Sequence, residues 1–183
     1  MKRILSFLLF VAALMTPFAL QAQTYLSENF ENVSSGLPSG WVSVGPGTVA
    51  VYNDAEYAHS GNKSIRFSDA TSNVVALPAL SVPTNTVQVR LWTRSEGYPY
   101  CLTFDVGYVT DITDASSFVA ITTIDASDYL DTYKELTVYM SSAPADARIA
   151  FRHQPYSGMY YWFCDDVTVE DIPSCPPDRT SVV

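Results

Sequence analysis

Short runs in which apolar and polar residues alternate, each ended by a cluster of turn-forming residues, constrain the fold of this chain more than any other feature. In VQVRLWTR (87–94), Val89 and Leu91 fall on one face of an extended strand and Trp92 falls on the other. The same period of two recurs in CLTFDVGYV (101–109), KELTVYM (134–140) and ARIAFRH (147–153). Because no comparable helical period follows the N-terminal segment, we expect antiparallel sheets in an all-β sandwich, jelly roll or barrel.

The first 22 residues have the organisation of a secretory signal peptide. Lys2 and Arg3 precede the apolar stretch LSFLLFVAALMTPFAL, and Ala22 offers a small residue for cleavage. The stretch is short for a membrane span and Pro17 interrupts it. We therefore expect residues 1–22 to be removed and the product to be secreted or held at the cell surface, with the periplasm as the alternative.

Charge narrows the choice of partners. Without Lys2 and Arg3 the chain keeps 8 basic residues against 19 acidic ones, a formal net charge of −11. This balance disfavours nucleic acid as a partner, since binding a polyanion needs a basic face. An acidic surface instead favours solubility or a cation such as calcium.

Residues 23–172 are long enough for one domain with a proper core. The proline-rich tail 173–183 is expected to be a linker or the start of a further module. Cys101 and Cys164 are candidates for a bridge between strands, whereas Cys175 is free or pairs with something outside the chain. The spacing of the three cysteines matches no zinc site.

Two adjacent acidic residues, Asp165 and Asp166, interrupt the strand-like run YYWFCDDVTVED (160–171). If the valines that follow face the core, the period of two places Asp165 on the core side. A core-side carboxylate is costly unless a cation or a partner neutralises it, and carboxylates are good calcium ligands. Calcium is therefore predicted here. The alternative is that Asp165 caps a turn or pairs with Arg66 or Arg148.

Two other segments can complete the oxygen shell of such an ion. Glu31 ends the early motif ENFE, and the turn HSGNKS (59–64) offers backbone carbonyls and the side chain of Asn62.

The order of four motifs carries a family resemblance. Phe30-Glu31, LPSGW (37–41), HSGNKSIRF (59–67) and YWFCDDVTV (161–169) together resemble the cleaved-adhesin, or choice-of-anchor J, domains of exported Bacteroidetes proteins. Those domains include the haemagglutinin-adhesin modules of gingipains and are similar to MAM domains and carbohydrate-binding jelly rolls. The resemblance covers nearly all of residues 25–171.

This resemblance implies a jelly-roll β-sandwich that follows the signal peptide and holds a structural calcium ion. The ligands it implies are Glu31, Asp165 and Asp166, with Ser60, Asn62 and Lys63 of the turn. It also implies that the tail leads into a fibronectin type III module. Cys164 departs from the pattern, because an aliphatic residue is expected there.

Catalytic motifs are not evident. Only His59 and His153 can serve as an imidazole base, His153 is expected at the surface or rim, and no GxSxG elbow occurs. We therefore predict that the chain is not an enzyme.

Aromatic residues outside the expected core indicate binding. The candidates for contact with a ligand are Tyr98, Tyr100, Tyr156, Tyr160 and Trp162. Such rings can stack on sugars or peptide side chains, although cross-strand packing is the alternative, and the one we prefer for Trp92. The predicted function is a secreted adhesion or binding module for a carbohydrate or a cell-surface or extracellular protein. The alternatives are an accessory domain of a secreted peptidase or glycoside hydrolase whose catalytic part lies outside this chain, and a spacer.

Overall fold

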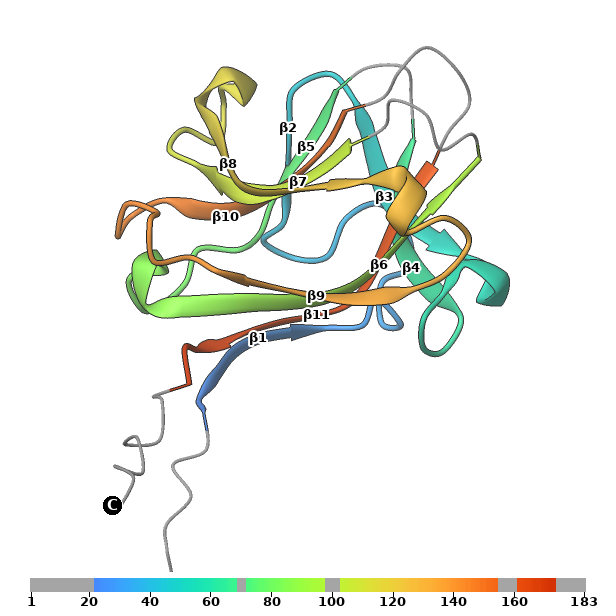
Figure 1. Ribbon diagram of the computed structural model, residues 1–183, viewed down its shortest axis with the longest axis horizontal. Coiled ribbons are helices and arrows are strands. Elements are labelled where there is room, and N and C mark those ends of the chain that lie inside the picture. Colours follow the sequence, from blue (N-terminus) through green and yellow to red (C-terminus); the bar gives the residue numbers. More distant parts are fainter. Residues whose placement is uncertain (1–21, 69–71, 98–102, 155–160, 174–183) are drawn as a thin grey trace, which may run out of the picture.

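Two antiparallel β-sheets packed face to face make up the protein in the computed structural model, which describes residues 22–68, 72–97, 103–154 and 161–173 (Figure 1). The strands are β1 (Thr24–Glu28), β2 (Val42–Val44), β3 (Thr48–Asn53), β4 (Lys63–Ser68), β5 (Asn73–Ala76), β6 (Val87–Glu96), β7 (Thr103–Val109), β8 (Phe118–Asp125), β9 (Lys134–Tyr139), β10 (Arg148–Gln154) and β11 (Tyr161–Asp171). Four single-turn 3-10 helices lie between them: η1 (Ala55–Tyr57), η2 (Thr84–Thr86), η3 (Ala115–Ser117) and η4 (Ala126–Asp128). The predicted all-β sandwich is confirmed.

The order of strands in each sheet shows that the first and last strands are neighbours. Sheet A has the order β3-β4-β11-β6-β9, and β1 also pairs with β11; sheet B has the order β2-β5-β10-β7-β8. Strands β4 and β1 share one edge of β11, since β4 pairs with residues 161–164 and β1 with residues 167–170. Figure 1 shows β1 and β11 running side by side at the end where the two chain termini leave the sandwich.

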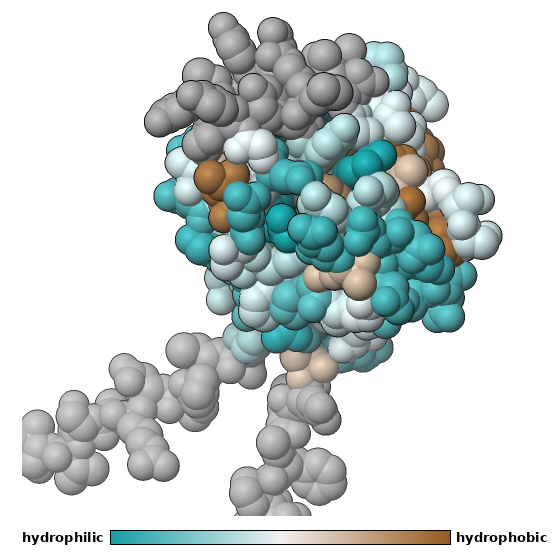
Figure 2. All heavy atoms as spheres, turned by 90° about the vertical axis from the view of Figure 1, so that its right-hand side faces the viewer, coloured by the Kyte–Doolittle hydropathy of each residue, from teal (hydrophilic) through white to brown (hydrophobic). Residues whose placement is uncertain are grey.

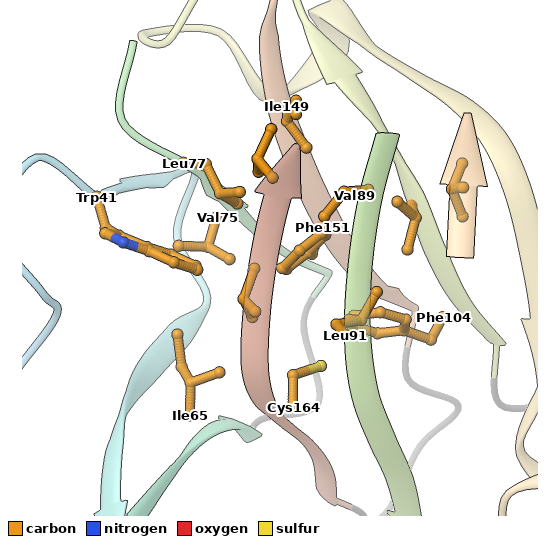
Figure 3. Close-up of a cluster of buried hydrophobic side chains, with 14 of the residues drawn as sticks. Trp41, Ile65, Val75, Leu77, Val89, Leu91, Phe104, Ile149, Phe151 and Cys164 are labelled. Carbon is orange, nitrogen blue, oxygen red and sulfur yellow. The ribbon is translucent and has the colours of Figure 1, made fainter. Parts of the chain in front are cut away.

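Apolar side chains fill the space between the sheets, as the period of two requires. Figure 3 shows Ile65 and Leu91 of sheet A directed toward Phe104 and Phe151 of sheet B. All four have no exposed surface. Phe30, from the first of the four motifs, is equally buried and lies edge-on to Trp41.

Strand β11 contains a β-bulge that overturns the predicted orientation of Asp165. Its pairing with β6 shifts between Asp165 and Thr168, and Asp166 takes a left-handed backbone conformation with φ of 47°. The extra residue lets both Cys164 and Val167 belong to the core, where Figure 3 shows Cys164. Asp165 therefore pairs with Trp92 on the outer face of sheet A, and the prediction of a core-facing Asp165 is wrong.

The same one-residue offset moves Trp162 to the core side. Its indole has no exposed surface, stacks on Phe104 with ring centroids 5.1 Å apart, and donates its N–H to Thr93. Trp162 therefore offers no ring face to a ligand at the surface, contrary to the prediction.

Cys164 is a free, fully buried thiol, and Cys101, with which the sequence allowed a bridge, lies outside the described residues. The sulfur of Cys164 lies 3.4 Å from the hydroxyl of Thr93, and burial raises the pKa of the thiol far above its ordinary value. The departure from an aliphatic residue is a small core substitution.

Among the described residues no helix has the length and hydropathy that a membrane crossing requires.

His153 lies in the core and not at the rim where it was expected. It has no exposed surface, it packs near Phe67 and Trp162, and neither ring nitrogen has a hydrogen-bond partner among the described residues. Burial lowers the pKa of His153 from 6.5 to about 4. The imidazole is therefore held neutral inside the protein.

Acid should consequently destabilise the domain through His153. Between pH 6.5 and about 4 the unfolded chain binds a proton that the folded chain does not, so the stability falls as the pH falls. The loss should reach about 3 kcal/mol at the lower end of this range. Urea unfolding of the wild type and of His153→Leu at several pH values measures it. The unfolding free energy of the variant should lack this pH-dependent loss. Parallel curves of unfolding free energy against pH for the two proteins would contradict the assignment.

Candidate functional site

The connection between β3 and β4, residues 54–62, folds back over the outer face of sheet A. Asp54 caps η1 by accepting the N–H of Glu56, and Tyr57 then stacks on Phe163 with centroids 4.9 Å apart. Two hydroxyls, of Ser64 and Tyr133, donate to the carbonyl of Tyr57. The turn thereby buries Phe163, although this side chain lies on the solvent side of the sheet.

The carboxylate of Asp165 anchors this turn by accepting hydrogen bonds from backbone N–H groups of the turn. Oδ2 accepts the N–H groups of His59 (2.8 Å) and Ser60 (3.0 Å), and Oδ1 accepts the N–H of Asp166 (2.7 Å). Asp165 has no exposed surface, and burial raises the pKa of its carboxyl to about 6 despite these hydrogen bonds. Of the arrangements considered from the sequence, the structure contains the turn cap and not an arginine pair.

The carboxylate of Asp166 holds the same turn through contacts with two side chains of the turn. One carboxylate oxygen lies 2.6 Å from Nδ1 of His59, and the other accepts the hydroxyl of Ser60 at 2.8 Å. The imidazole of His59 stacks on Trp92 with ring centroids 3.9 Å apart, so Trp92 packs within the protein, as preferred from the sequence, but against the turn and not across strands. A catalytic triad needs the serine hydroxyl on the histidine; here serine and histidine both bind the carboxylate, so no such triad is assembled at this turn.

Glu31 holds the other end of the turn. Its Oε1 accepts the N–H groups of Asn62 (2.8 Å) and Lys63 (2.7 Å), and the Lys63 ammonium donates to the carbonyls of Glu31 and Val33. Gly61 has φ of 65°, and a Cβ there would lie 2.5 Å from the Glu31 carboxylate. We call Glu31, Asp165, Asp166 and residues 59–64 the carboxylate clasp.

Backbone strain accompanies the clasp at both ends. Phe30 (φ 62°) precedes Glu31, and Asp166 (φ 47°) forms the bulge, although neither residue is glycine. Glu28 accepts the N–H of Phe30 at 2.7 Å and so supports its unusual conformation. Such strain persists only where the surrounding contacts determine it, which marks the clasp as a firmly specified part of the fold.

The clasp assembles all the residues predicted to bind calcium: Glu31, Ser60, Asn62, Lys63, Asp165 and Asp166. Its donors are oxygens, which suits calcium, and Oε2 of Glu31 accepts no hydrogen bond from a described residue. However, among the described residues no three acidic, histidine or cysteine side chains converge on one point. The backbone donors already satisfy Asp165, so the unpaired core carboxylate that motivated the ion does not exist. Calcium at the clasp stays a prediction.

Near the clasp, Arg66 of β4 lies between two tyrosine rings on the outer face of sheet A. The guanidinium carbon is 4.1 Å from the ring centroid of Tyr52 and 4.8 Å from that of Tyr161. Both rings therefore offer a face to the guanidinium at cation–π distance.

A polar network lies on the outer face of sheet B, and we call Asp105, Thr123, Arg152 and Gln154 the sheet B network. Oδ2 of Asp105 accepts hydrogen bonds from Nε of Arg152 (2.8 Å) and Nε2 of Gln154 (2.7 Å), while Oδ1 accepts the hydroxyl of Thr123 (2.5 Å). Asp105 is only 1% exposed, whereas the Arg152 side chain is 26% exposed and rests over Phe118.

Sequence reasoning missed this network. Arg152 and Asp105 are 47 residues apart in the sequence and become direct partners through the pairing of β10 with β7. Local alternation could place each residue on an outer face but could not bring the two together. The tyrosines that were predicted to bind a ligand, Tyr98, Tyr100, Tyr156 and Tyr160, lie outside the described residues.

The two sheets, their strand order and the clasp define a jelly-roll β-sandwich, the class of domain that the sequence resemblance implied. The K1 cleaved adhesin domain of Lys-gingipain from Porphyromonas gingivalis W83 matches with a TM-score of 0.62 and 22% identity over 82% of this chain and 99% of that one. The resemblance to cleaved adhesins is thus confirmed for the fold.

Carbohydrate-binding modules share this architecture. TmCBM61, solved in complex with β-1,4-galactotriose, matches with a TM-score of 0.57 and 17% identity over 82% of this chain and 99% of that one. The CBM22-1 xylan-binding domain of Paenibacillus barcinonensis Xyn10C gives a TM-score of 0.56 and 16% identity over 84% and 97% of the chains. No protein-family model and no curated protein matches the sequence. At these identities the likeness establishes the fold alone.

The contact between Gly61 and Glu31 gives a stability test of the clasp. Gly61→Ala should cost about 2–3 kcal/mol of unfolding free energy, from left-handed strain and from displacing the carboxylate. Gly36 is the matched control: it has φ of 75° but no atom within 4 Å of the position that a Cβ would take, so Gly36→Ala should cost only about 1 kcal/mol. Denaturant unfolding measures both. In a Glu31→Ala background the excess cost at Gly61 should vanish; equal costs at the two glycines would refute the clasp contact.

Proposed function

We propose that this chain is an exported, non-catalytic binding module that recognises a carbohydrate on the outer face of sheet B. The observation that carries the proposal is the sheet B network, in which a nearly buried carboxylate fixes an arginine and a glutamine that both reach solvent. Export rests on the predicted signal peptide.

In this proposal Asp105 positions the side chains of Arg152 and Gln154. Burying a carboxylate on the solvent side of a sheet has a desolvation cost, and here three neighbouring side chains offset it. In return the Arg152 guanidinium is held in one plane over Phe118, with hydrogen-bond donors left for a ligand. Planar polar groups held rigidly beside an aromatic ring are suited to the hydroxyls and apolar faces of a sugar.

The neighbourhood of the network agrees with this role. Gln154 pairs with Thr103 across β10 and β7, and the chain continues from these residues into the segments that contain the predicted tyrosines.

Solved structures of the same fold support a glycan ligand. TmCBM61 was solved with a galactotriose, and the Paenibacillus domain is described as xylan-binding, so this fold serves glycan recognition in those proteins. Figure 2 shows a different side of the molecule, the one at the right of Figure 1, which is mainly hydrophilic and has its apolar residues in small separate groups. A broad apolar contact surface is therefore not a feature of that side.

Calcium bound at the clasp is part of the proposal and has its own test. A chelator should lower the melting temperature and added calcium should restore it, because an ion bound only by the folded state stabilises that state. The response should disappear in Asp165→Ala and persist in Asp128→Asn, whose carboxyl lies outside the clasp in η4. Calorimetry measures the shifts, and a melting curve that is unchanged by chelator in the wild type would rule out the ion.

Glycan binding by sheet B is tested at Arg152. Arg152→Ala should weaken binding to the best ligand of a glycan array at least about tenfold, the loss of roughly one charge-assisted hydrogen-bonded anchor. Arg90→Ala is the matched control, because Arg90 is also an ion-paired surface arginine but lies on sheet A. Isothermal titration with the array ligand compares the three proteins. An equal loss of affinity in both variants, or no loss in Arg152→Ala, would contradict a glycan site on sheet B.

A further inference from the structure

Arg66 differs from the other described arginines in the groups that surround its side chain. Arg90, Arg94 and Arg152 each lie near a carboxylate, and Arg148 donates to the carbonyls of Leu77 and Gly40. Arg66 forms no ion pair with a described carboxylate and instead lies against two aromatic faces.

The two rings come from the strands on either side of β4. Tyr52 belongs to β3 and Tyr161 to β11, and the pairing of both strands with β4 fixes their positions. The contacts with the rings use none of the five N–H donors of the guanidinium for a hydrogen bond to a described residue, so these donors are available to a ligand. All three side chains are partly exposed, so a ligand can reach them from solvent.

An in-plane guanidinium fork is complementary to a carboxylate, which it can bind through two parallel N–H···O bonds. Among the described acids, Glu96, the cross-strand partner of Tyr161, accepts the hydroxyl of Tyr57 at 2.7 Å and forms no ion pair with Arg66. The formal net charge of −9 disfavours a densely charged polyanion and leaves room for a ligand with an isolated carboxylate.

We propose that Tyr52, Arg66 and Tyr161 form a carboxylate-recognition site for a glycan that carries an isolated uronic acid. The tyrosine rings border the sugar, and Arg66 binds its carboxylate in the guanidinium plane. The site lies on the outer face of sheet A, is separate from the sheet B network, and does not depend on it.

The test compares an oligosaccharide whose single charged group is one glucuronic acid with the same oligosaccharide after reduction of that carboxyl to the alcohol. The purified wild-type chain should bind the acidic form at least about tenfold more tightly, as expected for one bidentate charge-assisted contact. Arg66→Lys keeps the charge but not the planar fork, and should abolish this preference. Arg90→Lys, on the same face of the same sheet, should keep it.

A second measurement covers loss of folding in the variant. In the wild type, titration with methyl glucuronide should shift the NMR signals of the Tyr52 and Tyr161 rings, and methyl glucoside should not. Equal affinity of the wild type for both oligosaccharides, or a preference that survives Arg66→Lys, would overturn the proposal. Arg152→Ala should leave the preference unchanged, so failure of the sheet B site and failure of this site are distinguishable.

Discussion

The hydrogen bonds from backbone N–H groups to the buried carboxylate of Asp165 determine the arrangement of the whole outer face of sheet A. They hold the turn 59–64 down on the sheet, at the point where β11 changes its edge partner from β4 to β1. Glu31, which follows β1, grips the same turn from the other side. Three segments far apart in the sequence are thus joined by acceptors on acidic side chains, and the aromatic packing of Tyr57 over Phe163 follows from it.

The bulge in β11 is the structural condition for this arrangement. A regular strand would alternate without interruption and would send the carboxylate that follows Cys164 and the side chain of Val167 to the same face. With one extra residue, the core keeps Cys164 and Val167 while Asp165 turns outward and Asp166 reaches His59 and Ser60. The strained conformation of Asp166 is offset by the hydrogen bonds that its carboxylate and that of Asp165 receive.

Sequence reasoning recovered the fold because alternation is a local property, read correctly in β6, β7, β9 and β10. It also gathered the six clasp residues, through their resemblance to a family. It failed where a single residue changed the period: an apolar pattern continues on both sides of Asp166, so nothing in it reveals the bulge, and Trp162 was placed on the wrong face. Contacts between distant strands, such as Arg152 with Asp105, follow from pairing that no local pattern contains. The burial of His153 did have a local signal, because the period of two in β10 puts it on the same face as the buried Ile149 and Phe151.

The outer faces of the two sheets consequently have different capacities for binding. Much of the face of sheet A is occupied by its own turn, so His59, Trp92 and Tyr57 are engaged in intramolecular stacking. The part of this face that stays accessible includes a corner in which two tyrosine rings flank an arginine without a described acidic partner. On sheet B the arginine is already neutralised by Asp105, which favours uncharged hydroxyl groups over anions. An acidic chain can in this way present one surface suited to neutral sugars and one suited to a single carboxylate. The groups beside each arginine, a carboxylate for Arg152 and two tyrosine rings for Arg66, decide which ligand it favours, and the net charge does not.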